Sequence, residues 1–168
     1  MNSISHCTIP SPLGDMLLVA DGDTLAGVYF SGQKYFPAAA PHWREDAGQP
    51  VLRAARQQLG EYFAGVRTKF DLQLAAPGTA FQRSVWHAIA TIPCGSTATY
   101  TEVAARAGHP GSVRAAGAAT GRNPWSIVVP CHRVVGANGA LTGYAGGLDR
   151  KRALLVLEQN PAGFTLAA

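Results

Sequence analysis

Short apolar segments separated by turn residues open the chain. Residues 7–10, 16–20 and 25–30 are apolar, and the stretches between them contain Pro and Gly or Asp and Gly. Runs of this length between such turns predict strands, and their close succession predicts a three-stranded antiparallel meander. Residues 33–49 are rich in Ala, Pro and Gly and have no clear period, which indicates a loop.

Helical spacing begins at Val51. Apolar side chains recur at Ala55, Leu59 and Tyr62, three or four positions apart, and the pattern stops at Gly65. This spacing predicts one amphipathic helix that packs on the sheet.

A second alternating segment follows at residues 70–74, where Phe and Leu alternate with Asp and Gln. The alternation predicts another strand, and the Pro-Gly dipeptide at 77–78 interrupts it. We therefore expect a domain boundary at this dipeptide, with an N-terminal structural domain over residues 1–78 and a C-terminal domain over residues 79–168.

The pattern of the second half is mainly helical. Thr79 is suited to cap a helix that ends before Pro93. Residues 101–107 and 112–119 predict two helices joined by a Gly-containing turn, and Ser112 is expected to cap the second of them. Apart from Arg114, the surface of that second helix is almost entirely Ala and Gly. Such a helix can approach another surface closely, or its alanines can be packed inside the protein.

The last third of the chain combines a buried segment, a loop and a helix. The apolar run at 127–129 predicts a buried strand, and the glycine-rich stretch at 141–147 predicts a loop. Asp149 is expected to cap a final helix over residues 150–159. The whole pattern predicts an α+β fold, with a small N-terminal antiparallel sheet and helix followed by a mostly helical C-terminal part that contains a helix-turn-helix.

Composition limits the setting in which this protein works. The hydrophobic fraction of 47% is ample for a packed core. Three cysteines, an odd number without Cys-x-x-Cys spacing, favour neither a disulfide framework nor a zinc site, so we expect a reducing, cytoplasmic location. We expect no membrane span, because no apolar run approaches the roughly 20 residues that a span needs.

Charge is distributed unevenly along the chain. Residues 1–80 contain six Lys/Arg and seven Asp/Glu, a net charge of −1, whereas residues 81–168 contain eight and three, a net charge of +5. A basic second half is typical of a module that binds a polyanion such as nucleic acid, although a solvated basic face would have the same composition.

Cys131 and His132 are the candidates for nucleophilic chemistry. A free thiol has a pKa of about 8.5, so a nucleophilic cysteine needs a partner that removes its proton, and His132 is the nearest. Adjacent side chains of extended backbone point to opposite sides, which favours a bridging water over direct contact. Glu158 is the carboxylate best placed to orient the imidazole. The alternatives are a buried structural cysteine and a surface glutamate.

A set of motifs across the second half resembles a known family. Pro-Cys-His-Arg-Val at 130–134 follows an Ile-Val-Val run and an Asn-Pro dipeptide. Further segments match in the same order, at residues 78–82, 92–95, 100–104, 114–117, 121–124, 142–147 and 154–158. Together they resemble the O6-alkylguanine-DNA alkyltransferases of the bacterial stand-alone type. The resemblance implies a ribonuclease H-like N-terminal domain and a DNA-repair activity that transfers a methyl or other alkyl group irreversibly, in a single turnover.

The resemblance also implies catalytic roles. Cys131 would accept the alkyl group, His132 would take its proton through a water, and Glu158 would hold the imidazole. Tyr100 would protonate N3 of the departing guanine. Asn123 would tie the turn after the second helix of the helix-turn-helix to the backbone of the active site.

DNA contacts are implied by the same resemblance. Arg114 would enter the space that the flipped nucleotide leaves, and the helix that carries Ser112, Ala115 and Ala118 would lie in the minor groove of double-stranded DNA, largely independently of sequence. Backbone carbonyls of Val134 and Cys131 would meet the exocyclic amine of the base, and backbone amides would meet its O6 side, at Tyr144, Ala145 and Gly146. We expect a monomer, no cofactor and no metal.

Two other functions use similar residues. A hydrolase with a Cys-His-Glu triad would turn over repeatedly and would need an oxyanion hole. A non-enzymatic, alkyltransferase-like protein would only bind the lesion, but such relatives typically lack the acceptor cysteine, which is present here as Cys131.

Overall fold

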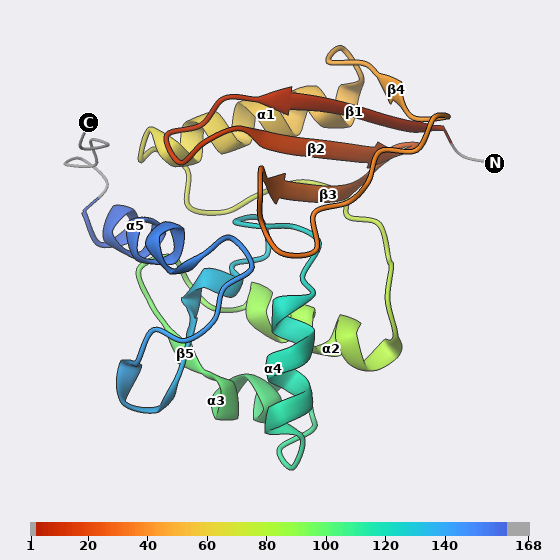
Figure 1. The fold of residues 1–168 in the computed structure, drawn as a ribbon. Coiled ribbons are helices and arrows are strands. Elements are labelled where there is room, and N and C mark those ends of the chain that lie inside the picture. The colour runs from red at the N-terminus through yellow and green to blue at the C-terminus, as the bar shows by residue number, and fades with distance from the viewer. Residues whose placement is uncertain (1–2, 161–168) are drawn as a thin grey trace.

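The computed structural model describes residues 3–160, which form two layers (Figure 1). The upper layer of this view is a sheet with one helix packed on it, and the lower layer contains the other α-helices and their connecting loops. The ends of the two expected domains, residues 1–2 and 161–168, lie outside the described part. The arrangement confirms the α+β class predicted from the sequence.

The sheet consists of the predicted meander and one additional strand. The three antiparallel strands are β1 (Ile4–Ile9), β2 (Met16–Asp21) and β3 (Thr24–Phe30). A fourth strand, β4 (Arg44–Glu45), pairs parallel with β1 and completes the order β3-β2-β1-β4. The prediction of a loop over 33–49 was wrong at this point, because a strand of two charged residues has no apolar alternation to reveal it.

β2 is buried along nearly its whole length, which is unusual for an antiparallel sheet. The reason is that both faces of the sheet are covered. The helix α1 (Pro50–Phe63) packs against β2, and Met16, Leu18 and Ala20 belong to one core cluster that contains side chains of both layers. The helical layer meets the sheet at the edge of β3, through the bridge between Val28 and Trp125. Leu17 and Val19 point to the other face and are buried outside that cluster. A continuous apolar strand is what such double coverage requires.

α1 forms where the helical spacing predicted it. The side chain of Gln49 caps its first turn by accepting hydrogen bonds from the N–H groups of Val51 and Leu52, at 2.7 and 3.0 Å. Gly65 adopts a φ of 78°, a left-handed conformation that glycine tolerates best, where the chain turns away. The buried face consists of the side chains of Leu52, Ala55, Leu59 and Tyr62.

The free edge of β3 explains why residues 70–74 do not form the predicted strand. Two separate segments share this edge. Leu25 forms a single bridge with Leu74, and Val28 forms a single bridge with Trp125. In the parallel register of the Leu25–Leu74 bridge, residues 70–73 lie level with residues 21–24, and β3 begins only at Thr24, so almost no strand is there for them to pair with. Only Leu74 has strand character.

The helical layer contains α2 (Ala80–Ala90), α3 (Tyr100–Arg106), α4 (Val113–Gly121) and α5 (Leu148–Gln159). Thr79 caps α2 as predicted, in a capping box with Gln82, and Thr99 caps α3 in the same way with Glu102. α3 and α4 pack together as the predicted helix-turn-helix. Within residues 3–160, no helix is long and apolar enough to cross a membrane.

Two predicted helix caps were wrong. Ser112 occupies the N-cap position of α4, but its side chain makes no capping hydrogen bond. α5 begins at Leu148 after Gly147, whose φ of 92° sets the chain direction. Asp149 therefore lies inside the first turn, where its carboxylate is 3.6 Å from Arg152. A carboxylate in this turn still interacts favourably with the helix dipole.

Candidate active site

The segment before Cys131 is a tight turn and not the predicted strand. Ile127 has a φ of 73°, which is strained for a β-branched residue and costs on the order of 1–3 kcal/mol. The side-chain amide of Asn123 holds this turn by donating to the backbone oxygens of Val129 at 2.8 Å and Trp125 at 3.2 Å. Asn123 thus joins the end of α4 to the chain that leads into Cys131.

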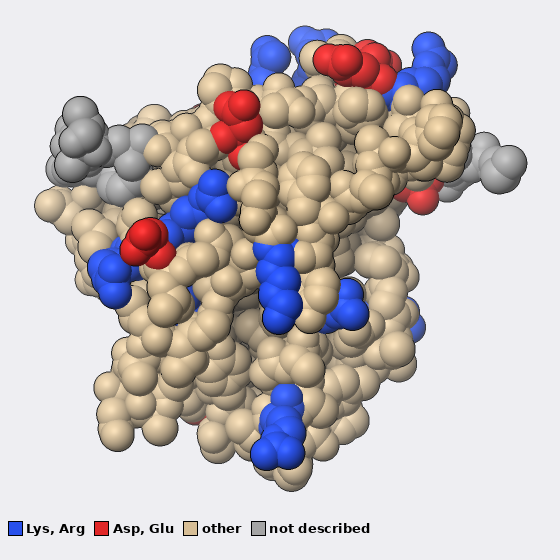
Figure 2. All heavy atoms as spheres, in the orientation of Figure 1, with Lys and Arg blue, Asp and Glu red and all other residues tan. Residues whose placement is uncertain are grey.

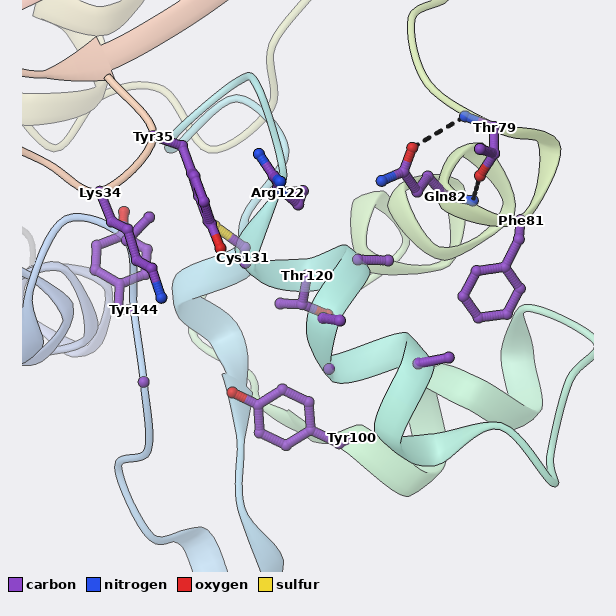
Figure 3. A pocket seen from close by; sticks show the side chains of 17 residues that line it. Lys34, Tyr35, Thr79, Phe81, Gln82, Tyr100, Thr120, Arg122, Cys131 and Tyr144 are labelled. Carbon is purple, nitrogen blue, oxygen red and sulfur yellow. Dashed lines mark hydrogen bonds between the residues drawn. The ribbon is translucent and has the colours of Figure 1, made fainter. Parts of the chain in front are cut away.

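Cys131 lies in a 3₁₀ turn, η1 (Cys131–Arg133), and not in extended backbone as the sequence argument assumed. Its side chain is 6% exposed and lines a pocket of about 750 Å³ (Figure 3). Tyr100 from the start of α3 and Tyr144 from the glycine-rich loop line the same pocket. The pocket therefore gathers residues from three separate parts of the second half around one thiol.

His132 and Glu158 form a buried pair. His132 Nε2 lies 2.6 Å from Glu158 Oε2, and the two side chains are 0% and 1% exposed. Arg133 contributes two further hydrogen bonds, from Nε to Oε1 at 2.8 Å and from Nη2 to Oε2 at 3.0 Å. The guanidinium supplies the positive charge that a buried carboxylate needs.

This arrangement determines the protonation of the pair. Burial opposes the charge on Glu158, but hydrogen bonds from His132 and Arg133 outweigh it and lower its pKa to about 2. Burial lowers the pKa of His132 despite the carboxylate beside it. An ionised carboxylate can only accept, so the proton of a neutral His132 is on Nε2, and Nδ1 presents a lone pair. Among the described residues, this buried Nδ1 has no hydrogen-bond partner.

The Cys131 thiol is protonated at rest. Burial raises its pKa, although the side chain of Asn123 and the charge of Lys151 act in the opposite direction. A thiol of this kind becomes a nucleophile only when a base removes its proton. The unsatisfied Nδ1 of the neighbouring His132 is such a base.

Lys151 is a buried residue that the sequence reasoning missed. It is 0% exposed, and its ammonium donates to the backbone oxygens of Val134 at 2.6 Å and Thr142 at 2.8 Å. It thereby ties the glycine-rich loop to the chain after Cys131. The sequence contained a signal, because Lys151 lies seven residues before Glu158 and therefore on the same face of α5. Lysine is rarely buried, so a lysine on the inward face of a helix points to an unusual environment.

Arg133 and Tyr62 were also missed. Arg133 is 5% exposed and donates from Nη1 to the Ile92 oxygen at 2.6 Å, in addition to its two bonds to Glu158. The Tyr62 hydroxyl, from the other layer, donates to Glu158 Oε2 at 2.6 Å. No local pattern distinguishes Tyr62 from an ordinary core residue of an amphipathic helix.

The surface of α4 settles the choice that the sequence left open. Ala115 and Ala118 are exposed together with Arg114, whereas Ala116 and Ala119 are buried. One half of the alanines thus packs inside, and the other half forms a smooth outer face. Ser112 is half-buried at the start of this helix.

The mouth of the pocket is also lined by the N-terminal half. Lys34 and Tyr35 line the pocket together with Tyr144 (Figure 3), and the Lys34 backbone N–H donates to the Ala145 oxygen at 2.9 Å. The guanidinium of Arg122, at the end of α4, stacks over the Tyr35 ring at 3.9 Å from its centre. Two cationic side chains, Lys34 and Arg122, therefore border the opening.

Not every predicted contact residue lines this pocket. Tyr144 and Ala145 do, but Val134 and Gly146 are buried outside its lining. Gly146 packs so closely that an added Cβ would lie 2.7 Å from the Tyr144 ring. The Val134 oxygen already accepts from Lys151, which leaves one lone pair for another donor.

Charge is distributed unevenly on the face that carries α4. The charged side chains seen over α4 and in the zone between the layers are basic, whereas the sheet layer and the surface beside α5 carry both acidic and basic side chains (Figure 2). The surface around the pocket is thus suited to a polyanion.

The chain matches two family descriptions. Residues 4–76 match the ribonuclease-like domain of 6-O-methylguanine DNA methyltransferase, and residues 80–160 match its DNA-binding domain. The methylated-DNA–protein-cysteine methyltransferase of Mycobacterium tuberculosis is 48% identical over 165 residues, which cover 97% of this chain and 98% of that protein. The protein of the same name from Methanosarcina acetivorans is 49% identical over 153 residues, 91% and 97% of the two chains.

The fold is also similar to a solved structure from one of these organisms. The crystal structure of M. tuberculosis OGT in complex with DNA has a TM-score of 0.86 and 46% identity, with 94% of each chain covered. The fold and the site together define a class of protein in which a ribonuclease-like sheet domain is joined to a helix-turn-helix domain that carries a buried cysteine. The chain belongs to the 6-O-methylguanine DNA methyltransferase family.

Proposed function

We propose that this protein repairs alkylated DNA by moving a methyl or other alkyl group from O6 of guanine to its own Cys131. The observation that carries the proposal is a pocket-lining Cys131 followed directly by His132, whose Nε2 is bound to Glu158 and whose buried Nδ1 has no partner among the described residues. The names of the relatives, methylated-DNA–protein-cysteine methyltransferases, support the same reaction.

The proton and the alkyl group move in opposite directions. The Cys131 proton passes through a water to His132 Nδ1, and Glu158 stabilises the imidazolium that forms. The thiolate attacks the alkyl carbon in line, the new S–C bond forms, and the bond from carbon to O6 breaks. The product is a thioether, which has no easy route back to the thiol, so each molecule reacts once.

Tyr100 supplies the proton for the leaving base. Guanine departs poorly as an anion, and a proton delivered to N3 lets it leave neutral. The Tyr100 hydroxyl accepts from the Thr142 hydroxyl at 3.3 Å, which leaves its own proton available for donation. Its position in the lining of the Cys131 pocket supports this role.

Double-stranded DNA is the proposed partner, and the damaged nucleotide enters the pocket after flipping out of the stack. Arg114 fills the space that it leaves. The exposed alanines of α4, with Ser112 at its start, are small enough for the helix to lie in a minor groove about 6 Å wide. Binding there is largely independent of sequence and depends mainly on phosphates.

The base is held by backbone groups in this proposal. The oxygens of Cys131 and Val134 receive the exocyclic amine, and the amides of Tyr144, Ala145 and Gly146 meet the O6 side. The division at residue 78 separates this machinery from a structural N-terminal domain. We further propose that the protein acts as a monomer in the cytoplasm, without a cofactor or a metal.

The experiment is incubation with a duplex that contains one O6-methylguanine, followed by intact-mass and peptide analysis. We expect a gain of one methyl group on the peptide that contains Cys131, and no more than one repaired base per protein molecule. Repeated turnover would instead favour the hydrolase. Tight binding without any mass gain would favour a protein that only marks the lesion.

A further inference from the structure

Tyr62 connects the N-terminal layer to the active site. It lies in the last turn of α1 and is 2% exposed, and its hydroxyl donates to Glu158 Oε2 at 2.6 Å across 96 residues of sequence. The ring is held from two sides, by Phe63 at 5.4 Å and Phe70 at 5.8 Å between ring centres. The hydroxyl therefore has little freedom to point elsewhere.

Glu158 Oε2 receives three donors. These are the Tyr62 hydroxyl at 2.6 Å, His132 Nε2 at 2.6 Å and Arg133 Nη2 at 3.0 Å. Oε1 receives Arg133 Nε alone, at 2.8 Å. The oxygen that orients the imidazole is thus the more heavily bonded of the two, and Tyr62 and His132 share it at equal distances.

Two consequences follow from this shared oxygen. The three donors together hold the carboxylate in one orientation, so the imidazole that it binds is also held. In addition, each donor draws on the same negative charge, which weakens the attraction of that charge for a proton on His132.

We propose that Tyr62 is a positioning residue for alkyl transfer, which holds Glu158 Oε2 against His132 and limits its charge so that His132 stays neutral and can accept the Cys131 proton. The inference rests on the proposed function, because it assigns Tyr62 to the same proton relay. It gives the N-terminal layer a direct part in the chemistry, in addition to its structural part.

Other charged or titratable groups also face this relay. Arg133 from η1 neutralises the carboxylate, and Lys151 from α5 lies on the side of Cys131. Cys94, from the turn after α2, lies close enough to Glu158 and Arg133 to interact with both. All of them remain in place when only the Tyr62 hydroxyl is removed, so a change in pH dependence reports on that hydroxyl.

The test is Tyr62→Phe, which keeps the ring and its packing. Single-turnover alkyl transfer is measured across pH, with DNA affinity measured separately. With one donor lost, Glu158 attracts the imidazolium proton more strongly, and the pKa of His132 rises. Transfer needs neutral His132, so the acid limb of the rate profile should move to higher pH by about half a unit to one unit. The plateau rate should fall between about twofold and tenfold, with DNA affinity unchanged.

Tyr29→Phe is the matched control. Tyr29 lies in β3 of the same layer, and its hydroxyl makes no hydrogen bond among residues 3–160, so its removal should leave both the limb and the plateau rate unchanged. If Tyr62→Phe does not fold, 3-fluorotyrosine placed at position 62 keeps the hydroxyl and makes it a stronger donor. The acid limb should then move to lower pH.

The outcomes separate the two proposals. An acid limb that stays in place in the Tyr62 variant overturns the positioning role, even if the plateau rate falls, because lost packing alone would slow transfer without changing the pKa of His132. Absence of methyl transfer to Cys131 in the parent protein overturns the proposed function itself. A shifted acid limb in the Tyr62 variant, together with normal methyl transfer by the parent protein, supports both.

Discussion

The two sides of Cys131 differ in burial and in hydrogen bonding. Behind it, Glu158 is 1% exposed at the side chain and its oxygens receive donors from His132, Arg133 and Tyr62. In front of it lie an open pocket and a helix surface of small residues, where Arg114 is exposed and makes no ion pair within the described chain. The buried side is complete before substrate arrives, whereas the open side is completed by the substrate.

This difference predicts which properties a substitution on each side of Cys131 will change. A proton relay must be held in one geometry in a dry environment, because its energetics depend on fixed donors and low dielectric. A surface for DNA must keep its donors free, because each phosphate contact replaces contacts with water and counterions. Substitutions behind Cys131 should therefore affect stability and chemistry together, and substitutions on the exposed surface of α4 should affect DNA handling alone.

The largest expected effect is at the acceptor itself. Cys131→Ala should abolish alkyl transfer completely, with affinity for O6-methylguanine duplex retained, because the thiol is the only bond-forming group while the DNA surface is untouched. Intact mass measures alkyl transfer, and electrophoretic mobility shift measures the affinity for the duplex. Cys94→Ala is the control and should still gain one methyl group. Transfer by the Cys131 variant would mean that the acceptor is elsewhere.

Glu158→Gln should be next in size. It leaves the Arg133 guanidinium buried without its counter-charge, which costs about 3–5 kcal/mol of unfolding free energy in comparable pairs. Urea denaturation measures this loss, and transfer should slow as well.

Glu61→Gln provides the comparison for that variant, because it breaks the Glu61–Arg67 pair, whose side chains are about one third exposed. The expected loss there is within about 1 kcal/mol. Equal losses in the two variants would contradict the contrast between a buried relay and a surface pair.

Arg114→Ala should reduce repair by about tenfold, roughly 1.4 kcal/mol, without loss of stability. The exposed guanidinium has no structural partner to lose, and its proposed role is to fill the space left by the flipped base. Single-turnover repair and thermal melting measure the two quantities. Arg152→Ala, on the exposed side of α5, should change neither. A large drop in melting temperature for Arg114→Ala would instead identify it as a structural residue.

The most gradual effect should appear in the pH dependence of stability. The pKa of Glu158 is depressed to about 2, below its unfolded value of about 4.3, so its contribution is present above pH 4.3 and is lost as pH falls towards 2. The pKa of His132 is also lowered, so the unfolded chain binds a proton first, and stability declines below about pH 6.5. Urea titrations at several pH values test this, and His132→Gln should remove the decline that starts near pH 6.5.

Local patterns in the sequence predicted the parts of the fold that form through local interactions. The meander, α1, the Thr79 cap and the helix-turn-helix all depend on spacing and on residues within a few positions of each other. The predicted strands at 70–74 and 127–129 failed for a different reason. Both have suitable apolar residues, but residues 70–74 pair with β3 at Leu74 alone, and residues 127–129 form a turn in which Ile127 has a φ of 73°.

The candidate site divides in the same way. Cys131 and its neighbour His132 could be recognised from their motif, and the family resemblance pointed to Glu158 as the third member. Arg133 and Tyr62 could not be recognised, because each is an ordinary residue type for its element, and Lys151 left only the weak signal of sharing a helix face with Glu158. Their importance arises only from being buried beside groups that lie far away in the chain.

The sequence alone determined which elements form and which residues have the chemistry, since helix periodicity, turn residues and a reactive cysteine are all properties of short segments. The tertiary structure decided the protonation of the site. A carboxylate on α5 is ionised because His132 and Arg133 donate hydrogen bonds to it, and the imidazole that it binds is neutral because it is buried. Burial and hydrogen bonding between distant segments exist only once the two layers have packed, and no local pattern contains them.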